Sequence, residues 1–180
     1  MIDEARIIAQ LKDNSQKEKA FNTLVHEYQE VLYWQIRRLV ISHDDADDVL
    51  QNTFLKAWLA LDDFRGESKI SSWLFRIAIN ESLGFLEKKK RSIDIASDAN
   101  DYLSNQLLSD PYFDGDKTQA LLLQAIDLLP NKQKAVFNMK YYQEMKYEDM
   151  SQILGTSIGA LKASYHHAVK KITDFFQQND

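Results

Sequence analysis

The chain has 180 residues, a formal net charge of -5 and a hydrophobic fraction of 44%, enough for one ordinary domain or two small ones. It contains no cysteine, which excludes disulfides and thiolate metal sites and suits a reducing cytosol. No apolar run is long enough to cross a membrane, so we expect no membrane insertion. The first residues also lack the basic-then-apolar order of a signal peptide, and we therefore expect a cytoplasmic protein.

The scarcity of glycine and proline, with five and two residues, predicts an all-α protein with short connections. In the first half, a period near 3.6 predicts helices over about 3–13, 17–40, 45–61 and 71–91. We expect Val31 to face inward with its apolar neighbours in the second helix. Ser42 is expected to cap the third.

The outer face of the third helix is expected to carry Asp48, Gln51, Asn52 and Lys56. The residues alone indicate only a solvated acidic face. In the fourth helix, Lys69, Trp73, Arg76 and Asn80 recur every three or four positions and can project together.

An aromatic ring, a guanidinium and an amide on one helix face are groups that stack on bases and bond to base edges. The basic run that follows suits phosphate contact; it comprises Lys88, Lys89, Lys90 and Arg91. An ordinary packed helix with cations at its carboxyl end is the alternative.

Residues 93–115 are acidic, rich in serine and asparagine, and broken by Pro111 and Gly115, so we interpret them as a linker. A second helical unit, 116–180, follows a first unit, 1–92. Its first two helices are predicted at 118–129 and 132–142, the second capped by Asn131.

The most specific pattern in the sequence lies in residues 147–176. A short helix over 147–154, a turn at Gly155-Thr156 and a long helix capped by Ser157 have the helix-turn-helix layout. Small residues at the start of the second helix allow close approach to the major groove, and cations lie further along. A plain helical hairpin is the alternative. The residues expected on the exposed side are Gly159, Ala160, Lys162, Ala163, Ser164, His166, His167, Lys170 and Lys171.

With both halves considered, the chain resembles a bacterial RNA polymerase sigma factor of the extracytoplasmic-function (ECF) group. The segments similar to sigma region 2 are AFNTLVHEYQEVLYWQIRRLV, DDADDVLQNTFLKAWLALDDFRG and SSWLFRIAINESLGFLEKKKR. The segment similar to region 4 is LLPNKQKAVFNMKYYQEMKYEDMSQILGTSIGALKASYHHAVKKI. The resemblance implies core RNA polymerase and promoter DNA as partners, and an anti-sigma protein as a regulator.

The resemblance also implies roles for matching positions. The residues expected to bind the polymerase are Asp48, Gln51, Asn52 and Leu55. Those expected to contact the minus-ten element are Phe64, Lys69, Ser72, Trp73, Arg76, Asn80 and the basic run 88–91. Those expected at the minus-thirty-five element are Ser157 and the exposed set of the last helix given above. Phe64 and Trp73 have an alternative as core aromatics, and Glu81 would repel a phosphate.

Two other functions stay open on the residues: a dimeric helix-turn-helix regulator that works without polymerase, and a helical adaptor that binds only protein. We find no catalytic constellation and no Gly-rich phosphate loop, so we predict neither an enzyme nor a cofactor. A metal at His166 and His167 is discounted, because adjacent helical side chains point about 100° apart and no third ligand is near.

Overall fold

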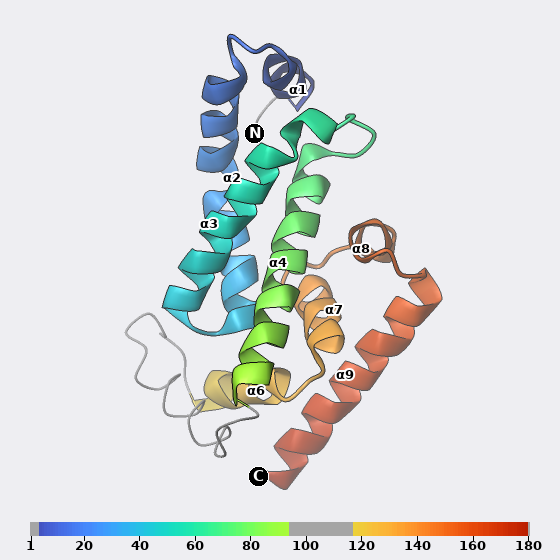
Figure 1. Ribbon diagram of the computed structural model, residues 1–180. Coiled ribbons are helices and arrows are strands. Elements are labelled where there is room, and N and C mark those ends of the chain that lie inside the picture. Colours follow the sequence, from blue (N-terminus) through green and yellow to red (C-terminus); the bar gives the residue numbers. More distant parts are fainter. Residues whose placement is uncertain (1–3, 94–116, 180) are drawn as a thin grey trace.

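The computed structural model describes residues 4–93 and 117–179, and within these ranges it contains helices and no strand. Figure 1 shows the helices in two groups, α1 to α4 and α6 to α9. The prediction of an all-α protein is confirmed. In chain order the elements are α1 Glu4–Lys12, α2 Lys17–Val40, α3 His43–Leu59, the 3-10 turn η1 Leu61–Asp63, α4 Ile70–Ile93, α6 Lys117–Asp127, α7 Asn131–Tyr141, α8 Tyr147–Leu154 and α9 Ile158–Gln178.

In the first group, α2, α3 and α4 pack against one another along their length, and α1 lies against α2 at one end (Figure 1). The apolar stripe of each helix turns toward the others, as the 3.6 period predicts. Leu24 and Leu32 of α2, Ala46 of α3 and Leu74 of α4 are all fully buried. This packing leaves the opposite face of α3 available for other contacts, whereas α4 also packs against α7 and α8.

The second group is organised on α9, which packs against α6, α7 and α8 (Figure 1). Gly155 ends α8 in the left-handed region at φ 61°, and α9 begins three residues later. Met150, Ile153 and Leu161 are buried and hold the two helices together. The predicted helix-turn-helix is therefore present.

The helix caps show where local sequence signals suffice. Ser42 accepts a hydrogen bond from the Asp45 amide at 3.4 Å, and Ser157 accepts one from the Ala160 amide at 3.3 Å, so both predicted caps are confirmed. The predicted Asn131 cap is wrong. Asn131 is the first residue of α7, because Pro130 occupies the cap position with ψ 141° and no side-chain cap.

The exposure of α2 differs in part from the prediction. Val31 was expected to face inward, but it is 51% exposed, because the apolar stripe of α2 is wider than the surface that its neighbours cover. Trp34, one turn later, is also exposed. The predicted linker lies, apart from Ile93 at the end of α4, outside the described residues.

The two helix groups are in direct contact. α4 packs against α7 and α8, and α2 packs against α7. One buried cluster contains Leu32 and Leu74 from the first group together with Met139 and Met150 from the second. In this arrangement the two groups share a core.

Candidate nucleic-acid and protein interfaces

The outer face of α3 presents the four predicted polymerase-binding residues together. Asp48, Gln51 and Asn52 are exposed, and Leu55 is 57% exposed. The exposed side chains of Leu59 and Trp58 extend this surface. The sequence analysis did not identify these two residues as part of it. The spacing of Leu55 and Leu59, one helical turn apart, was the available signal. The result is an exposed apolar strip bordered by an acid and amides.

Two ion pairs join α3 to α4. Lys56 pairs with Glu81 of α4 at 2.5 Å, and Asp45 pairs with Lys89 at 2.6 Å. The Glu81 carboxylate is thus next to a cation, which offsets the repulsion expected between it and a phosphate. Lys89, by contrast, is half-buried and already has an anionic partner, so its ammonium is less available to DNA than the sequence suggested.

The loop before α4 is held by aromatic packing. The rings of Phe64 and Trp73 lie 4.9 Å apart, and both pack against the buried cluster. This geometry is that of the core alternative for the two aromatics. Ile70 is fully buried at the start of α4, while Lys69 is exposed and Ser72 half-buried beside it.

Arg76 and Asn80 are exposed residues of α4, one turn apart. The Arg76 guanidinium nevertheless has partners: its Nε donates to the Ile153 carbonyl at 3.2 Å, and its Nη2 donates to the Gln152 carbonyl. Both carbonyls belong to α8. Further along α4, three cations of the basic run stay exposed: Lys88, Lys90 and Arg91.

On α9, nearly all the predicted minus-thirty-five residues share the exposed side. Ser164 is half-buried, and the other members from Gly159 to Lys171 are exposed. The Lys162 ammonium lies 5.7 Å from the Tyr147 ring centroid, and Lys171 donates to Gln133 at 3.1 Å. His166 and His167 have their ring centroids 6.1 Å apart. Within the described ranges, no three His, Cys, Asp or Glu side chains form a metal-ligand group.

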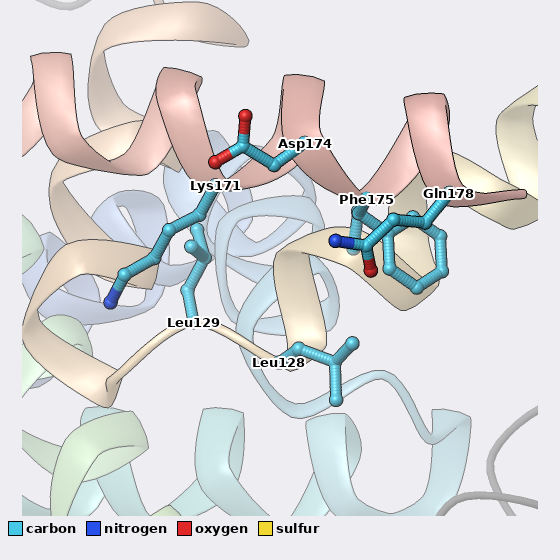
Figure 2. Close-up of a pocket in the computed structure, with 7 residues that line it drawn as sticks. Leu128, Leu129, Lys171, Asp174, Phe175 and Gln178 are labelled. Carbon is cyan, nitrogen blue, oxygen red and sulfur yellow. The ribbon is translucent and has the colours of Figure 1, made fainter.

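A hollow of about 260 Å³ lies between the carboxyl end of α6 and the last turns of α9 (Figure 2). Leu128 and Leu129 line one side, and Lys171, Asp174 and Phe175 line the other. Lys171 is the one predicted DNA-contacting residue that borders it. The hollow therefore lies at the edge of the candidate DNA surface of α9.

Comparisons with known proteins cover both halves of the chain. The family model described as "Sigma-70 region 2" matches residues 24–92, and the model described as "Sigma-70, region 4" matches residues 119–172. The ECF RNA polymerase sigma-E factor of Haemophilus influenzae is 30% identical in an alignment of 174 positions that covers 88% of this chain and 88% of the relative. The chain belongs to the ECF group of RNA polymerase sigma factors.

A second relative of this sigma factor is the RNA polymerase sigma-H factor of Pseudomonas aeruginosa, 30% identical in an alignment of 168 positions that covers 88% of this chain and 87% of the relative. Among solved structures, the sigma factor RpoE with the anti-sigma factor NepR from Bartonella quintana has a TM-score of 0.68 and 24% identity, over 88% of this chain and 98% of that one. CnrH with the cytosolic domain of CnrY has a TM-score of 0.69 and 23% identity, over 98% and 99%. These two show the fold.

Membership of this family defines the function. The protein is a sigma factor that directs RNA polymerase to promoters for transcription initiation. A match to both sigma regions does not favour the stand-alone regulator or the adaptor, because neither alternative needs a region 2. In the described part of the chain, no helix is long and apolar enough to span a membrane.

Proposed function

We propose that the exposed face of α3 binds the core polymerase. Its centre is the apolar strip of Leu55 and Leu59, and Asp48, Gln51 and Asn52 border it. An apolar centre with a polar rim is the usual composition of a protein interface. The carboxylate and amides suit arginine side chains on the partner. The exposure of these side chains, in a helix whose other face is fully buried, supports this assignment.

The minus-ten element is assigned to the loop after η1 and to α4. Phe64 and Trp73 shape the loop from beneath, while Lys69, Arg76 and Asn80 supply polar groups for bases. Extruding a base costs a few kcal/mol, which stacking and edge contacts must offset. Ser72 lies beside the loop, and the exposed cations of the basic run suit phosphates.

The minus-thirty-five element is assigned to α9. Its first turn carries Gly159 and Ala160, so the helix can approach base edges closely. Lys162 is the cation nearest that end, and Ser164 offers a hydroxyl. With few bidentate guanine contacts available, groove shape contributes to recognition. His166, His167 and Lys170 follow along the exposed side and suit the DNA backbone.

At the scale of the chain, we assign residues 1–92 to polymerase binding and the minus-ten element, 93–115 to a linker and 116–180 to the minus-thirty-five element. The protein acts in the cytoplasm as a binding subunit, with no reaction of its own. Two proteins of similar fold were solved in complexes, one with an anti-sigma factor and the other with the cytosolic domain of CnrY. We infer that a protein of the same kind restrains this chain.

The observation that carries the proposal is the match to both sigma regions together with the exposure of the α3 face and of most of the assigned α9 residues. Run-off transcription with purified core polymerase, followed by sequencing of the transcript starts, tests it. Promoter-selective transcripts are expected only when both components are present. Operator binding by the free protein as a dimer would instead support the stand-alone regulator. No salt-dependent DNA affinity in any assembly would support the adaptor.

A further inference from the structure

Lys162 is the cation nearest the amino end of α9, the end that we assign to base edges of the minus-thirty-five element. It follows the buried Leu161, and its own side chain is exposed. A lysine side chain is long and flexible, so an unrestrained ammonium loses conformational freedom when it binds DNA. A neighbouring group that restrains the ammonium beforehand reduces this cost and strengthens binding.

The neighbouring group is the ring of Tyr147, the first residue of α8. The Lys162 ammonium lies 5.7 Å from the ring centroid, within the range of a cation–π interaction. Figure 1 shows α8 beside the amino end of α9, where the two helices pack through buried residues that include Met150 and Leu161. This packing brings the tyrosine ring to the start of the helix that we assign to the major groove.

A ring restrains the ammonium without neutralising it. An ion pair with Glu148 or Asp149, the acidic residues that follow Tyr147 in α8, would place an anion where DNA must bind. In the part of the chain that the structure describes, Lys162 pairs with no carboxylate within 4 Å. The face of a ring attracts the cation electrostatically, and the N–H groups of the ammonium remain able to donate to DNA.

The Tyr147 ring is itself held by α7 and by the core. The Lys140 ammonium lies 5.0 Å from the same ring centroid and donates a hydrogen bond to the Met145 carbonyl at 3.2 Å. Tyr147 is half-buried and packs against the cluster that contains Met150. Lys140 is also half-buried, whereas Lys162 is exposed. Of the two lysines at this ring, Lys162 is therefore the one that can reach DNA.

Tyr165 of α9 joins the same group of aromatic residues. Its ring stacks on Phe137 of α7, with centroids 5.8 Å apart. Burial raises the pKa of Tyr165, and proximity to the phenols of Tyr147 and Tyr141 raises it further. Helices α7, α8 and α9 thus meet in one aromatic cluster, which consists of Phe137, Tyr141, Tyr147 and Tyr165. The Lys162 ammonium lies against the member of this cluster that begins α8.

We propose that Tyr147 is a positioning residue for promoter recognition: its ring orients the Lys162 ammonium toward the minus-thirty-five element. This inference depends on the proposed function, because it assumes that Lys162 contacts base edges. Lys162 carries the only charged side chain in residues 158–164, the first two turns of α9. Discrimination between base pairs at this end of the helix therefore depends on how well one ammonium is placed.

The experiment uses the protein bound to core polymerase and a promoter defined by the run-off assay. Competition binding compares that promoter with versions that carry single base-pair changes in the minus-thirty-five element, and the ratio of affinities measures discrimination. A salt titration measures the charge contacts with phosphate. The variants are Tyr147→Leu, Tyr147→Phe, Lys162→Ala and the double variant Tyr147→Leu/Lys162→Ala.

Tyr141→Leu is the matched control, because it makes the same change at an exposed tyrosine of the same cluster. The Tyr141 ring stacks on Phe137, and among the described residues no lysine ammonium lies over it. This variant should discriminate between base pairs as the wild type does.

Tyr147→Leu should lower discrimination at one or more base pairs about two- to fivefold, the size of an exposed cation–π interaction. Its salt dependence should stay unchanged, because every cation remains. Tyr147→Phe should keep the wild-type value, since the ring remains. Lys162→Ala should also lower discrimination, and the double variant should lose no more than Lys162→Ala alone, because the ring then has no ammonium to orient.

Circular dichroism checks folding, and Tyr147→Met replaces Tyr147→Leu if the leucine variant is unfolded. Undiminished discrimination in the folded variant would overturn the positioning role. An equal loss in Tyr147→Phe would do so as well, and so would additive losses in the double variant, since independent residues add.

A failure of the proposed function gives a different result. Lys162→Ala would then keep the wild-type discrimination, which would remove Lys162 from the base contacts and the positioning role with it. A loss in Lys162→Ala without any loss in Tyr147→Leu would refute only the role of Tyr147.

Discussion

Gly155 and Gly159 lie four residues apart, yet the backbone makes different demands on them. Gly155 has φ 61° at the end of α8, a conformation that side chains with a Cβ adopt at a cost. Gly159 lies in the first turn of α9 without a positive φ, and a Cβ added there would meet no atom within 4 Å. The first glycine is needed for the turn, and the second is not needed for folding.

Alanine at the two positions should therefore change stability in opposite directions. Gly155→Ala should lower the free energy of unfolding by about 1 kcal/mol or somewhat more, because of left-handed strain. Gly159→Ala should raise it by up to about 0.5 kcal/mol, since alanine has a higher helix propensity than glycine and the difference is smaller in a first turn than in a helix interior. Urea unfolding followed by circular dichroism measures both. A loss of stability in Gly159→Ala would contradict the assignment of open space there.

Asn80 is the exposed amide one turn after Arg76, on the face assigned to the minus-ten element. Asn80→Ala should slow promoter opening, measured by permanganate reactivity of unpaired thymines, and leave capture by core polymerase unchanged. Gln29→Ala removes a comparable exposed amide from α2 and should affect neither measurement. If Asn80→Ala reduced capture and opening equally, the residue would be structural.

The residue scale also shows which features a sequence can predict. The caps at Ser42 and Ser157 and the turn at Gly155 depend on interactions within a few positions, and all were predicted correctly. The partner of Arg76 lies in α8, more than seventy positions away along the chain. The spacing of polar residues along a helix predicts which side chains project from the same face. It does not predict which residues of other helices those side chains contact.

At the scale of elements, α3 combines a buried stripe with an exposed strip that includes Leu55, Leu59 and Trp58. Its ion pairs to α4, through Lys56 and Asp45, join side chains that are partly exposed. Pairs of this kind contribute about 0–1 kcal/mol each, so they position the helix more than they stabilise it. The affinity of α3 for a partner is expected to depend mainly on the apolar strip and its polar border.

Reversing the charge of that border tests the polymerase interface. Asp48→Arg with Gln51→Arg should abolish capture by core polymerase, because arginine would replace an acid and an amide that we propose face cations of the polymerase. Co-purification on immobilised polymerase measures capture, and circular dichroism checks the fold. Ala5→Arg with Ala9→Arg adds two arginines on exposed positions of α1 and should retain capture. Undiminished capture by the α3 variant would refute the interface.

Helix boundaries were predicted to within about two residues, since apolar periodicity and caps act locally. The exceptions concern exposure. Val31 was assigned to the core from its apolar character, and Leu59 was not recognised as exposed. Which apolar positions of an amphipathic helix remain uncovered depends on the size and angle of its neighbours, and these are tertiary properties.

At the scale of the whole molecule, the sequence predicted two helical units and an acidic segment between them, and did not predict how the units pack. The pairs α4–α8 and α2–α7 join residues far apart in the chain. Their contacts combine shared apolar burial with groups such as Asn138 that are polar and incompletely bonded.

A net charge of -5 disfavours sequence-independent DNA binding by the free protein, because that binding is driven by positive charge. The cations that we assign to DNA lie on α4 and α9, and exposed lysines also lie elsewhere, such as Lys19 on α2.

The amino-terminal helix packs near the loop that we assign to the minus-ten element. Ile7 and Leu11 of α1 are buried, and a Cβ added at Gly66 would lie 3.9 Å from the Ile8 side chain. Ile7→Ala should reduce stability by about 2 kcal/mol or more and accelerate amide exchange in residues 64–69. Ala9→Ser, on the exposed side, should leave both unchanged.

The match to sigma region 2 begins only at residue 24, beyond α1. A version that starts at residue 24 would keep every side chain assigned to DNA, but it would lose α1 and about two turns of α2, with the buried Ala20 and Phe21. We therefore expect it to open promoters poorly, because the packing that supports the loop over 64–69 would be lost.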